Sequence, residues 1–274
     1  MSLSPVSQAT LWCSGAAALA YALAAWPWRE RTHAAAPSAV ALLAGWLLHA
    51  AAAVLDMTGE GPTHGVRLGF APVLSASVWL VVAVHAIESR FVPVPAVRIG
   101  LATAGAAAVL LAVLFPGEQR PFHSALGPWH FMLGVATHAL IAAAVLHGLW
   151  LGAAETRLRE RRGLAAPAPT QPAHALGLPL LQLERLTFRF VQAGFAVLSA
   201  TLLLGMAVGP RVDHKTVFSL LAWTCFAVLL WGRASRGWRG RIALRWLYAG
   251  GVLLLLAYVG SRFVYEVLLD RSWR

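Results

Sequence analysis

Long apolar runs dominate this chain of 274 residues. About 20 apolar residues in a helix cross the ~30 Å hydrocarbon layer of a bilayer, because each residue adds about 1.5 Å. Eight segments meet this measure: Ala9 to Trp26, Ser38 to Met57, Leu68 to Ile87, Val97 to Phe115, Pro128 to Gly152, Phe190 to Val208, His214 to Trp231 and Ala243 to Gly260. With 59% hydrophobic and only 12% charged residues, the chain exceeds the apolar content of a soluble domain. We predict an all-α polytopic membrane protein, a bundle of about eight transmembrane helices.

The basic residues are distributed unevenly between the two sides of this bundle. The first, third, fifth and seventh connections, with the adjoining helix ends, hold 15 of the 22 Lys and Arg, and the opposite side holds 7. Because cytoplasmic loops are enriched in Lys and Arg, both termini are expected on the periplasmic side. The longest connection, residues 153–189, contains an arginine run and the segment Ala165-Ala-Pro-Ala-Pro169. We therefore predict a single membrane domain over residues 1–274, with a flexible cytoplasmic loop at about 153–189.

Several functional classes receive no support from the sequence. The net charge of +11 does not indicate a nucleic-acid partner, because the arginines sit in short turns between apolar runs. The two cysteines, Cys13 and Cys225, lie in apolar runs and form no CxxC motif, which indicates core thiols. No HExxH motif, pair of carboxylates or Ser-His-Asp set stands at a plausible depth, so we expect no enzyme.

Histidines are the most informative polar residues of the apolar segments, because an ionisable side chain at membrane depth is costly and by default a candidate functional site. The predicted topology sorts them by side. His130 and His214 lie at outer helix ends, whereas His49 and His138 are deep in the second and fifth segments. The others are expected near inner helix ends or in loops and are not candidates: His33, His64, His85, His123, His147 and His174.

Helical spacing limits how these histidines can act together. His130 and His138 are eight residues apart on one helix, which is too far along the axis for both to bind one iron. Ligands must therefore come from different segments, and His130 with His214 is the best pair by topology. Taken alone, His214 also suits a helix cap or an interfacial residue.

The second segment presents a polar face. Trp46, His49, Ala53 and Asp56 share one side of the predicted helix. This face is expected to point into the bundle, where His49 could serve a haem or proton site or form a hydrogen bond that fixes helix packing. Both interpretations remain open.

The last third of the chain carries a distinctive set of segments. They are Leu180 to Arg189, Asp213 to Trp223, Gly237 to Trp246 and Leu256 to Phe263, joined in the first half by Trp46-Leu-Leu-His49, Gly69-Phe70 and Trp129-His-Phe131. Together these segments resemble the YpjD branch of the cytochrome c assembly membrane proteins, the CcsA/CcmC-like superfamily. The resemblance covers nearly the whole chain.

That resemblance implies a multi-pass protein of the bacterial inner membrane that handles haem during c-type cytochrome biogenesis, alongside other cytochrome c maturation proteins. Relatives that handle haem carry a tryptophan-rich outer segment between two outward histidines that ligate haem. His130 matches the first of these histidines, whereas residues 207–214 contain no tryptophan and residues 261–274 contain no histidine. The resemblance thus leaves His214 as the substitute outer ligand. We predict haem iron bound by His130 and His214, with His49 and His138 supporting haem entry from the bilayer.

A second hypothesis does not involve haem. In it the chain is an accessory or transporter-like membrane subunit, whose buried histidines serve packing or proton conduction.

Overall fold

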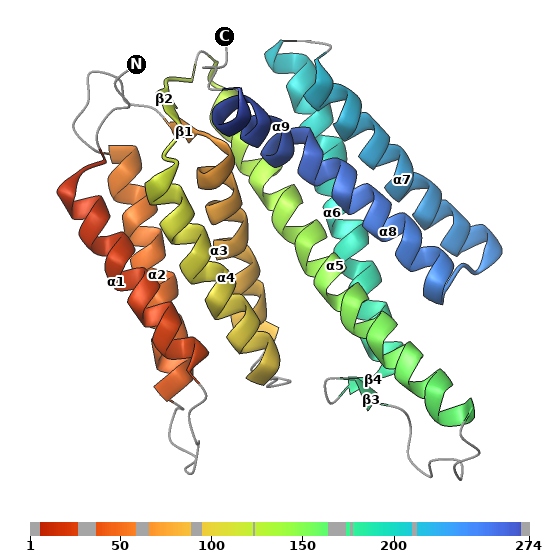
Figure 1. Cartoon of the computed structure of the whole chain (residues 1–274). Helices are drawn as coiled ribbons and strands as arrows, with labels where there is room; N and C mark the ends of the chain where they lie inside the picture. The colour runs from red at the N-terminus through yellow and green to blue at the C-terminus, as the bar shows by residue number, and fades with distance from the viewer. Residues whose placement is uncertain are drawn as a thin grey trace. The chain divides into compact units, whose positions relative to one another are not determined.

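The computed structural model describes residues 6–26, 37–58, 66–88, 95–122, 124–163, 174–175, 178–209 and 213–269. Nearly all of these residues are helical (Figure 1). The helices are α1 (Gln8–Ala25), α2 (Pro37–Thr58), α3 (Phe70–Glu88), α4 (Pro95–Leu114), α5 (Gly127–Gly163), α6 (Leu180–Val208), α7 (His214–Arg236) and α8 (Gly240–Leu255). The last continues through η1 (Leu256–Gly260), α9 (Ser261–Phe263) and η2 (Val264–Leu268), where η marks π-helix.

The all-α polytopic fold predicted from the apolar runs is confirmed. In the described part of the chain, seven helices are long and apolar enough to cross a membrane, namely α2 to α7 and the helix that starts with α8 and runs to Leu268. The predicted first span is also helical, as α1, but it is not among these seven. Its 18 residues include polar groups such as Gln8, Thr10 and Ser14, which lower its apolar character.

Helix ends differ from the prediction where the helices leave the apolar zone. α5 continues to Gly163 and α6 begins at Leu180, so both ends of the segment assigned to the 153–189 loop are helical. These extensions are rich in Leu, Glu and Arg, which favour helix but lack the unbroken hydrophobicity of a membrane span. Between them, β3 (His174–Ala175) pairs with β4 (Leu178–Pro179), and residues 164–173 lie outside the described part.

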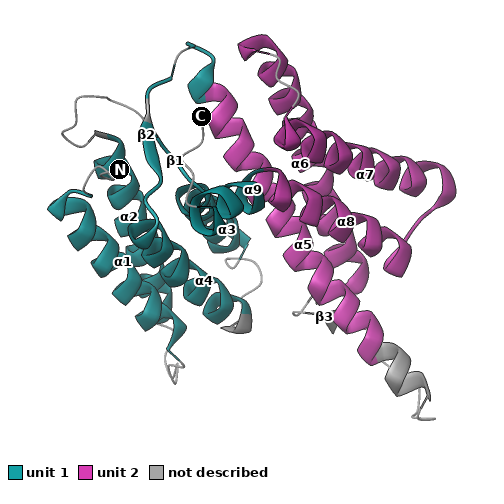
Figure 2. Cartoon of the chain, turned by 45° about the horizontal axis from the view of Figure 1, so that its top comes forward, with its two compact units in different colours: residues 1–128, 258–274 teal, residues 129–257 magenta. Residues whose placement is uncertain are grey.

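The chain divides into two compact units, shown in teal and magenta in Figure 2. Unit 1 comprises residues 1–128 and 258–274, and its helix α1 packs along α2 and α4. The ring of Tyr21, fully buried on α1, lies between two glycines. A Cβ atom at Gly45 of α2 would lie 2.9 Å from this ring, and one at Gly105 of α4 would lie 3.0 Å from it. The close approach of the three helices therefore depends on both glycines.

A short two-stranded sheet covers one end of unit 1. β1 (Val66–Leu68) pairs antiparallel with β2 (Glu118–Arg120), and Gly69 and Gly117 meet just beside the pairing. Gly117 has φ +68°, and a Cβ there would lie 2.8 Å from the Cα of Gly69, so both the backbone conformation and the space require glycine. Three-residue strands carry too little alternation to be recognised from sequence.

Unit 2 comprises residues 129–257 and contains most of α5, together with α6, α7 and α8. Its core includes Ile141 of α5, Leu198 of α6, Phe226 of α7 and Leu247 of α8. α7 and α8 form a hairpin that turns at Gly237, a left-handed residue with φ 64°. The Trp238 side chain packs against Gly232 inside this turn, where a larger residue than glycine has no room.

Candidate functional site

His130 lies in the first turns of α5 and points its ring at α6. Pro128 stands at the second position of α5, where its missing N–H removes no helical hydrogen bond. The ring reaches Gly205, whose absent side chain makes the space: a Cβ there would lie only 3.0 Å from Cε1 of His130. Figure 1 shows α5 beginning at the end of unit 2 where α6 ends and α7 begins. The site therefore stands at one helix-end surface of unit 2.

The surroundings of the His130 ring decide which of its atoms can bind a ligand. The ring lies close to the backbone of Thr201 on α6. Its Nδ1 atom is buried and has no hydrogen-bond partner in the described part of the chain. An imidazole nitrogen without a hydrogen-bond partner is the atom through which a histidine can bind a metal ion.

His214, the predicted partner of His130, is the first residue of α7 and is partly buried. It lies at the same end of unit 2, which Figure 1 shows through the start of α7. The residue before it, Asp213, is the N-cap: its Oδ1 accepts hydrogen bonds from Thr216 N at 2.9 Å and Thr216 Oγ1 at 3.1 Å. Burial raises the pKa of Asp213, but the Thr216 hydrogen bonds and the neighbouring Lys215 and His214 outweigh burial and lower it overall.

His138 lies two turns further along α5, and both of its ring nitrogens face carbonyl oxygens. Nδ1 is 2.8 Å from the carbonyl of Gly134 on its own helix, and Nε2 is 3.2 Å from the carbonyl of Leu254 on α8. Leu254 lies in the last turn of α8, just before the change from α- to π-helix at Leu256, where backbone carbonyls need partners outside the regular pattern. This histidine therefore ties α5 to α8 and presents no open nitrogen.

His49 has a similar role in unit 1. Its Nδ1 is 3.3 Å from Tyr21 Oη on α1, and its Nε2 is 2.8 Å from Ser75 Oγ on α3. All three side chains are buried, so they form a polar chain across α1, α2 and α3. Of the two sequence interpretations of His49, this geometry matches the interhelical hydrogen bond.

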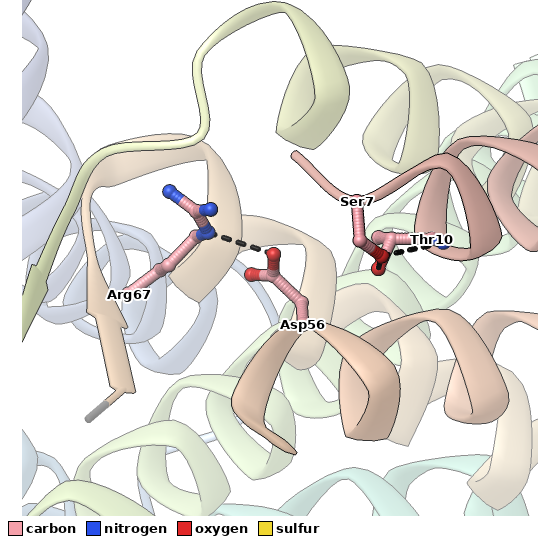
Figure 3. A network of polar contacts seen from close by, with 4 residues as sticks. All are labelled: Ser7, Thr10, Asp56 and Arg67. Carbon is pink, nitrogen blue, oxygen red and sulfur yellow. Dashed lines mark hydrogen bonds and ion pairs between the residues drawn. The ribbon is translucent and has the colours of Figure 1, made fainter. Parts of the chain in front are cut away.

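The predicted polar face of α2 is paired throughout with neighbouring groups. The rings of Trp46 and Trp79 stack with centroids 4.8 Å apart. Each indole N–H donates to the other residue's backbone carbonyl, at 3.1 and 3.0 Å. At the end of α2, Asp56 Oδ1 is 2.7 Å from Nε of Arg67, whose side chain is only 6% exposed (Figure 3). Figure 3 also shows the start of α1 nearby, where Ser7 Oγ accepts from Thr10 N at 3.1 Å.

The remaining histidines lie away from His130 or outside the described residues. His147 is buried, with Nδ1 2.7 Å from the Ala143 carbonyl, and His85 is buried on α3. His33, His64 and His123 lie outside the described residues, and His174 belongs to β3. In the described ranges no group of three or more His, Cys, Asp or Glu side chains could hold a metal ion. Any iron site there would rest on one or two histidines with ligands of other kinds.

Comparison with known families decides what kind of protein carries this site. The sequence profile described as "Cytochrome C assembly protein" matches residues 8–269. The chain belongs to this family.

Three curated relatives illustrate the similarity of this cytochrome c assembly family member to known proteins. It is 33% identical over 144 residues to "Inner membrane protein YpjD" of Escherichia coli, a match over 51% of the chain and 52% of YpjD. It is 32% identical over 244 residues to an "Uncharacterized 28.8 kDa protein in nifR3-like 5'region" of Azospirillum brasilense, covering 84% of the chain and 85% of that protein. "Cytochrome c biogenesis protein CcsA" of Gloeobacter violaceus is 25% identical over 48% of the chain and 40% of CcsA.

These matches differ in how much of each relative they cover. The chain spans about half the length of YpjD, whereas it spans most of the Azospirillum protein. No solved structure matches the chain. With its seven apolar helices, this member of the cytochrome c assembly family is a multi-pass membrane protein.

Sequence reasoning alone did not find the residues that shape the candidate site in this family member. Thr201 and Gly205 lie beside the His130 ring, and only Gly205 left a signal, in the small-xxx-small pattern with Gly209. Arg262 and Glu266, spaced i to i+4, also form a pair, with Nη1 and Oε1 3.6 Å apart. Its further contact, Phe70 N donating to Glu266 Oε2 at 3.3 Å, joins the end of the chain to the start of α3.

Proposed function

We propose that this protein handles haem during c-type cytochrome biogenesis, with His130 as an iron ligand at the outer face of the bacterial inner membrane. The observation that carries the proposal is the buried Nδ1 of His130, which has no partner among the described residues. Family membership and the CcsA relatives support the biogenesis role, and YpjD supports the inner-membrane location.

The residues around His130 suit a haem ligand. Gly205 leaves room for the ring between α5 and α6, close to the backbone of Thr201. Trp129 and Met132, its neighbours in the sequence, are 61% and 60% exposed and add apolar surface to this end of α5. Bound haem would supply an iron centre whose axial ligation the protein controls. His214, at the same helix-end surface, is our proposed second ligand.

The other two predicted cofactor residues receive a supporting role in this proposal. Both ring nitrogens of His49 and of His138 face a neighbouring hydroxyl or carbonyl oxygen, so neither ring has an open side for iron. His49 joins α1, α2 and α3 within unit 1, and His138 joins α5 to α8. We propose that their effect on haem is indirect.

Charge supports the assignment of His130 and His214 to the outer side. Arg233 and Arg236 lie in the last turn of α7, at the opposite end of that helix from His214. The positive-inside rule assigns the arginine-bearing end to the cytoplasm. By the same rule, we propose that both termini are periplasmic. We also propose that the partners of the protein are haem, lipid and other maturation proteins, and that it has no enzymatic activity.

The visible spectrum of the purified protein tests this proposal. We expect the wild type, reconstituted with haem in detergent, to give a Soret band that weakens or shifts in His130→Ala and His214→Ala. His147→Ala serves as the control, because its Nδ1 contacts a backbone carbonyl within α5. Absence of a Soret band in the wild type, or wild-type spectra from both outer-histidine variants, would refute the proposal.

One observation favours a second candidate function. The buried Tyr21–His49–Ser75 chain has the alternation of hydroxyl and imidazole groups that can relay a proton. A proton-conducting accessory subunit would acidify liposomes under an imposed pH gradient and would lose this activity in His49→Gln. Equal proton flux in the wild type and the variant would mean that Tyr21, His49 and Ser75 serve helix packing only.

A further inference from the structure

Exposed arginines gather where α7 ends and α8 begins, at the end of unit 2 opposite the start of α7. Arg236 and Arg239 flank the turn, and Arg241 and Arg245 follow on α8, with all four side chains exposed. The nearby ends of α5 and α6 add further exposed arginines, namely Arg157, Arg185 and Arg189. Such a density of like charge is unfavourable unless anions neutralise it.

The carboxylates close to this turn neutralise only part of the charge. Glu184 Oε1 lies 2.7 Å from Arg233 Nη1 and 3.6 Å from Arg239 Nε. Glu155 faces the backbone of Gly240, where a Cβ would lie 3.2 Å from its Oε2. In the part of the chain that the structure describes, no ion pair joins a carboxylate to the arginines at positions 236, 241 and 245.

Tryptophans surround these arginines at the same level. The guanidinium carbon of Arg236 lies 4.9 Å from the ring centroid of Trp231, which is 56% exposed. On the other side of the turn, the rings of Trp238 and Trp246 stack with centroids 6.1 Å apart. Tryptophan is enriched at the headgroup level of membranes, so the composition of this turn suits the depth of lipid phosphates.

The geometry of the arginines suits a phosphate group. Arg241 and Arg245 are spaced i to i+4 and therefore lie on one face of α8. Guanidinium groups bind phosphate through two parallel hydrogen bonds, which a lysine ammonium does not reproduce. The turn between the helices is well defined, because Gly237 adopts the left-handed conformation and Trp238 N donates to the Gly232 carbonyl at 3.2 Å.

We propose that the α7–α8 turn binds the headgroup of an anionic phospholipid, with Arg236, Arg241 and Arg245 on its phosphate and the tryptophans at the headgroup–acyl boundary. Charge complementarity selects an anionic headgroup over a zwitterionic one. Lipid binding at this turn requires only that the turn reach a lipid surface. It requires neither bound haem nor a particular orientation of the protein in the membrane.

Native mass spectrometry of the full-length protein in detergent tests the proposal. Phosphatidylglycerol and phosphatidylcholine with identical acyl chains are titrated separately, and bound lipid is counted. We expect wild type to retain phosphatidylglycerol preferentially, and the double variant R241Q/R245Q to bind it about 30-fold more weakly, from the usual contribution of each basic residue near a membrane surface. Circular dichroism and gel filtration verify that the exposed substitutions leave the fold intact.

The matched control is R185Q/R189Q, which removes two exposed charges from the same end of unit 2, but from α6 and not from the α7–α8 turn. This control should bind phosphatidylglycerol nearly as the wild type does. Equal loss in both double variants, equal binding of the two lipids, or unchanged binding by R241Q/R245Q would overturn the proposal. Displacement of the lipid by millimolar inorganic phosphate would also overturn it, since the site would then recognise the free anion.

Discussion

The substitution Gly205→Ala perturbs the His130 site through a single methyl group. An added Cβ would lie 3.0 Å from Cε1 of the imidazole and 3.6 Å from Nδ1. Carbon atoms prefer separations of about 3.5–4.0 Å, so the ring must move by about 0.5 Å. Such a shift moves the ring relative to Thr201 and turns Nδ1 away from its present direction.

Binding and folding should respond differently to this substitution. Loss of an orienting contact around a metal ligand typically lowers metal affinity about 10- to 100-fold, and we expect a loss of this size for haem. Alanine favours helix over glycine by about 1 kcal/mol, whereas overpacking costs about 1–3 kcal/mol, so the free energy of unfolding should change by less than about 2 kcal/mol. Haem titration followed at the Soret band measures the first quantity, and thermal unfolding in detergent measures the second.

Gly134→Ala is the matched control for this experiment. It places the same methyl group on α5 in unit 2, where nothing lies within 4 Å of the added atom. We expect haem affinity like that of the wild type. If Gly205→Ala binds haem as tightly as Gly134→Ala does, the His130 ring does not depend on the space at Gly205 and the reasoning fails.

Three further predictions concern stability, measured by unfolding in detergent. Tyr21→Phe removes the hydroxyl partner of buried His49 and should destabilise unit 1 by about 1–3 kcal/mol. An unfolding midpoint equal to that of the wild type would show that the Tyr21–His49 hydrogen bond does not stabilise the fold. Asp56→Asn removes the carboxylate whose Oδ1 lies 2.7 Å from Nε of the buried Arg67 and should cost about 1.5–3 kcal/mol, part of which a second change, Arg67→Met, should restore. The pKa of Asp213 is lowered by folding, so its contribution is present above its ordinary pKa near 3.8 and disappears as pH falls below it. Asp213→Asn should lack this acid-dependent part of the stability. If the variant lost stability with falling pH just as the wild type does, Asp213 would make no such contribution.

Apolar runs were sufficient to predict the helices because bilayer thickness imposes a length that the sequence displays directly. The same measure missed the helical extensions of α5 and α6, since those residues are charged and leave the apolar zone. It also missed the pairing of β1 with β2, which joins segments far apart in the sequence through three residues each.

The candidate site was less accessible from sequence. Topology was enough to predict that His130 and His214 stand at the same side, but the state of each imidazole depends on contacts with other helices. Both nitrogens of His49 contact hydroxyl groups of α1 and α3, whereas the His130 ring lies against Gly205 of α6 and its Nδ1 has no partner in the described part of the chain. No local pattern around a histidine encodes such contacts. The His130–His214 ligand pair therefore stays a prediction.

Replacing His130 by glycine and restoring its ring as free imidazole tests the central claim most directly. The variant His130→Gly removes the side chain that carries the open Nδ1 and leaves space of the same shape beside Gly205. Our account predicts that the Soret band of the haem-loaded protein weakens or shifts in this variant and returns to the wild-type position when imidazole is added. A variant whose spectrum equals that of the wild type before any imidazole is added would contradict the assignment of His130 as a haem ligand.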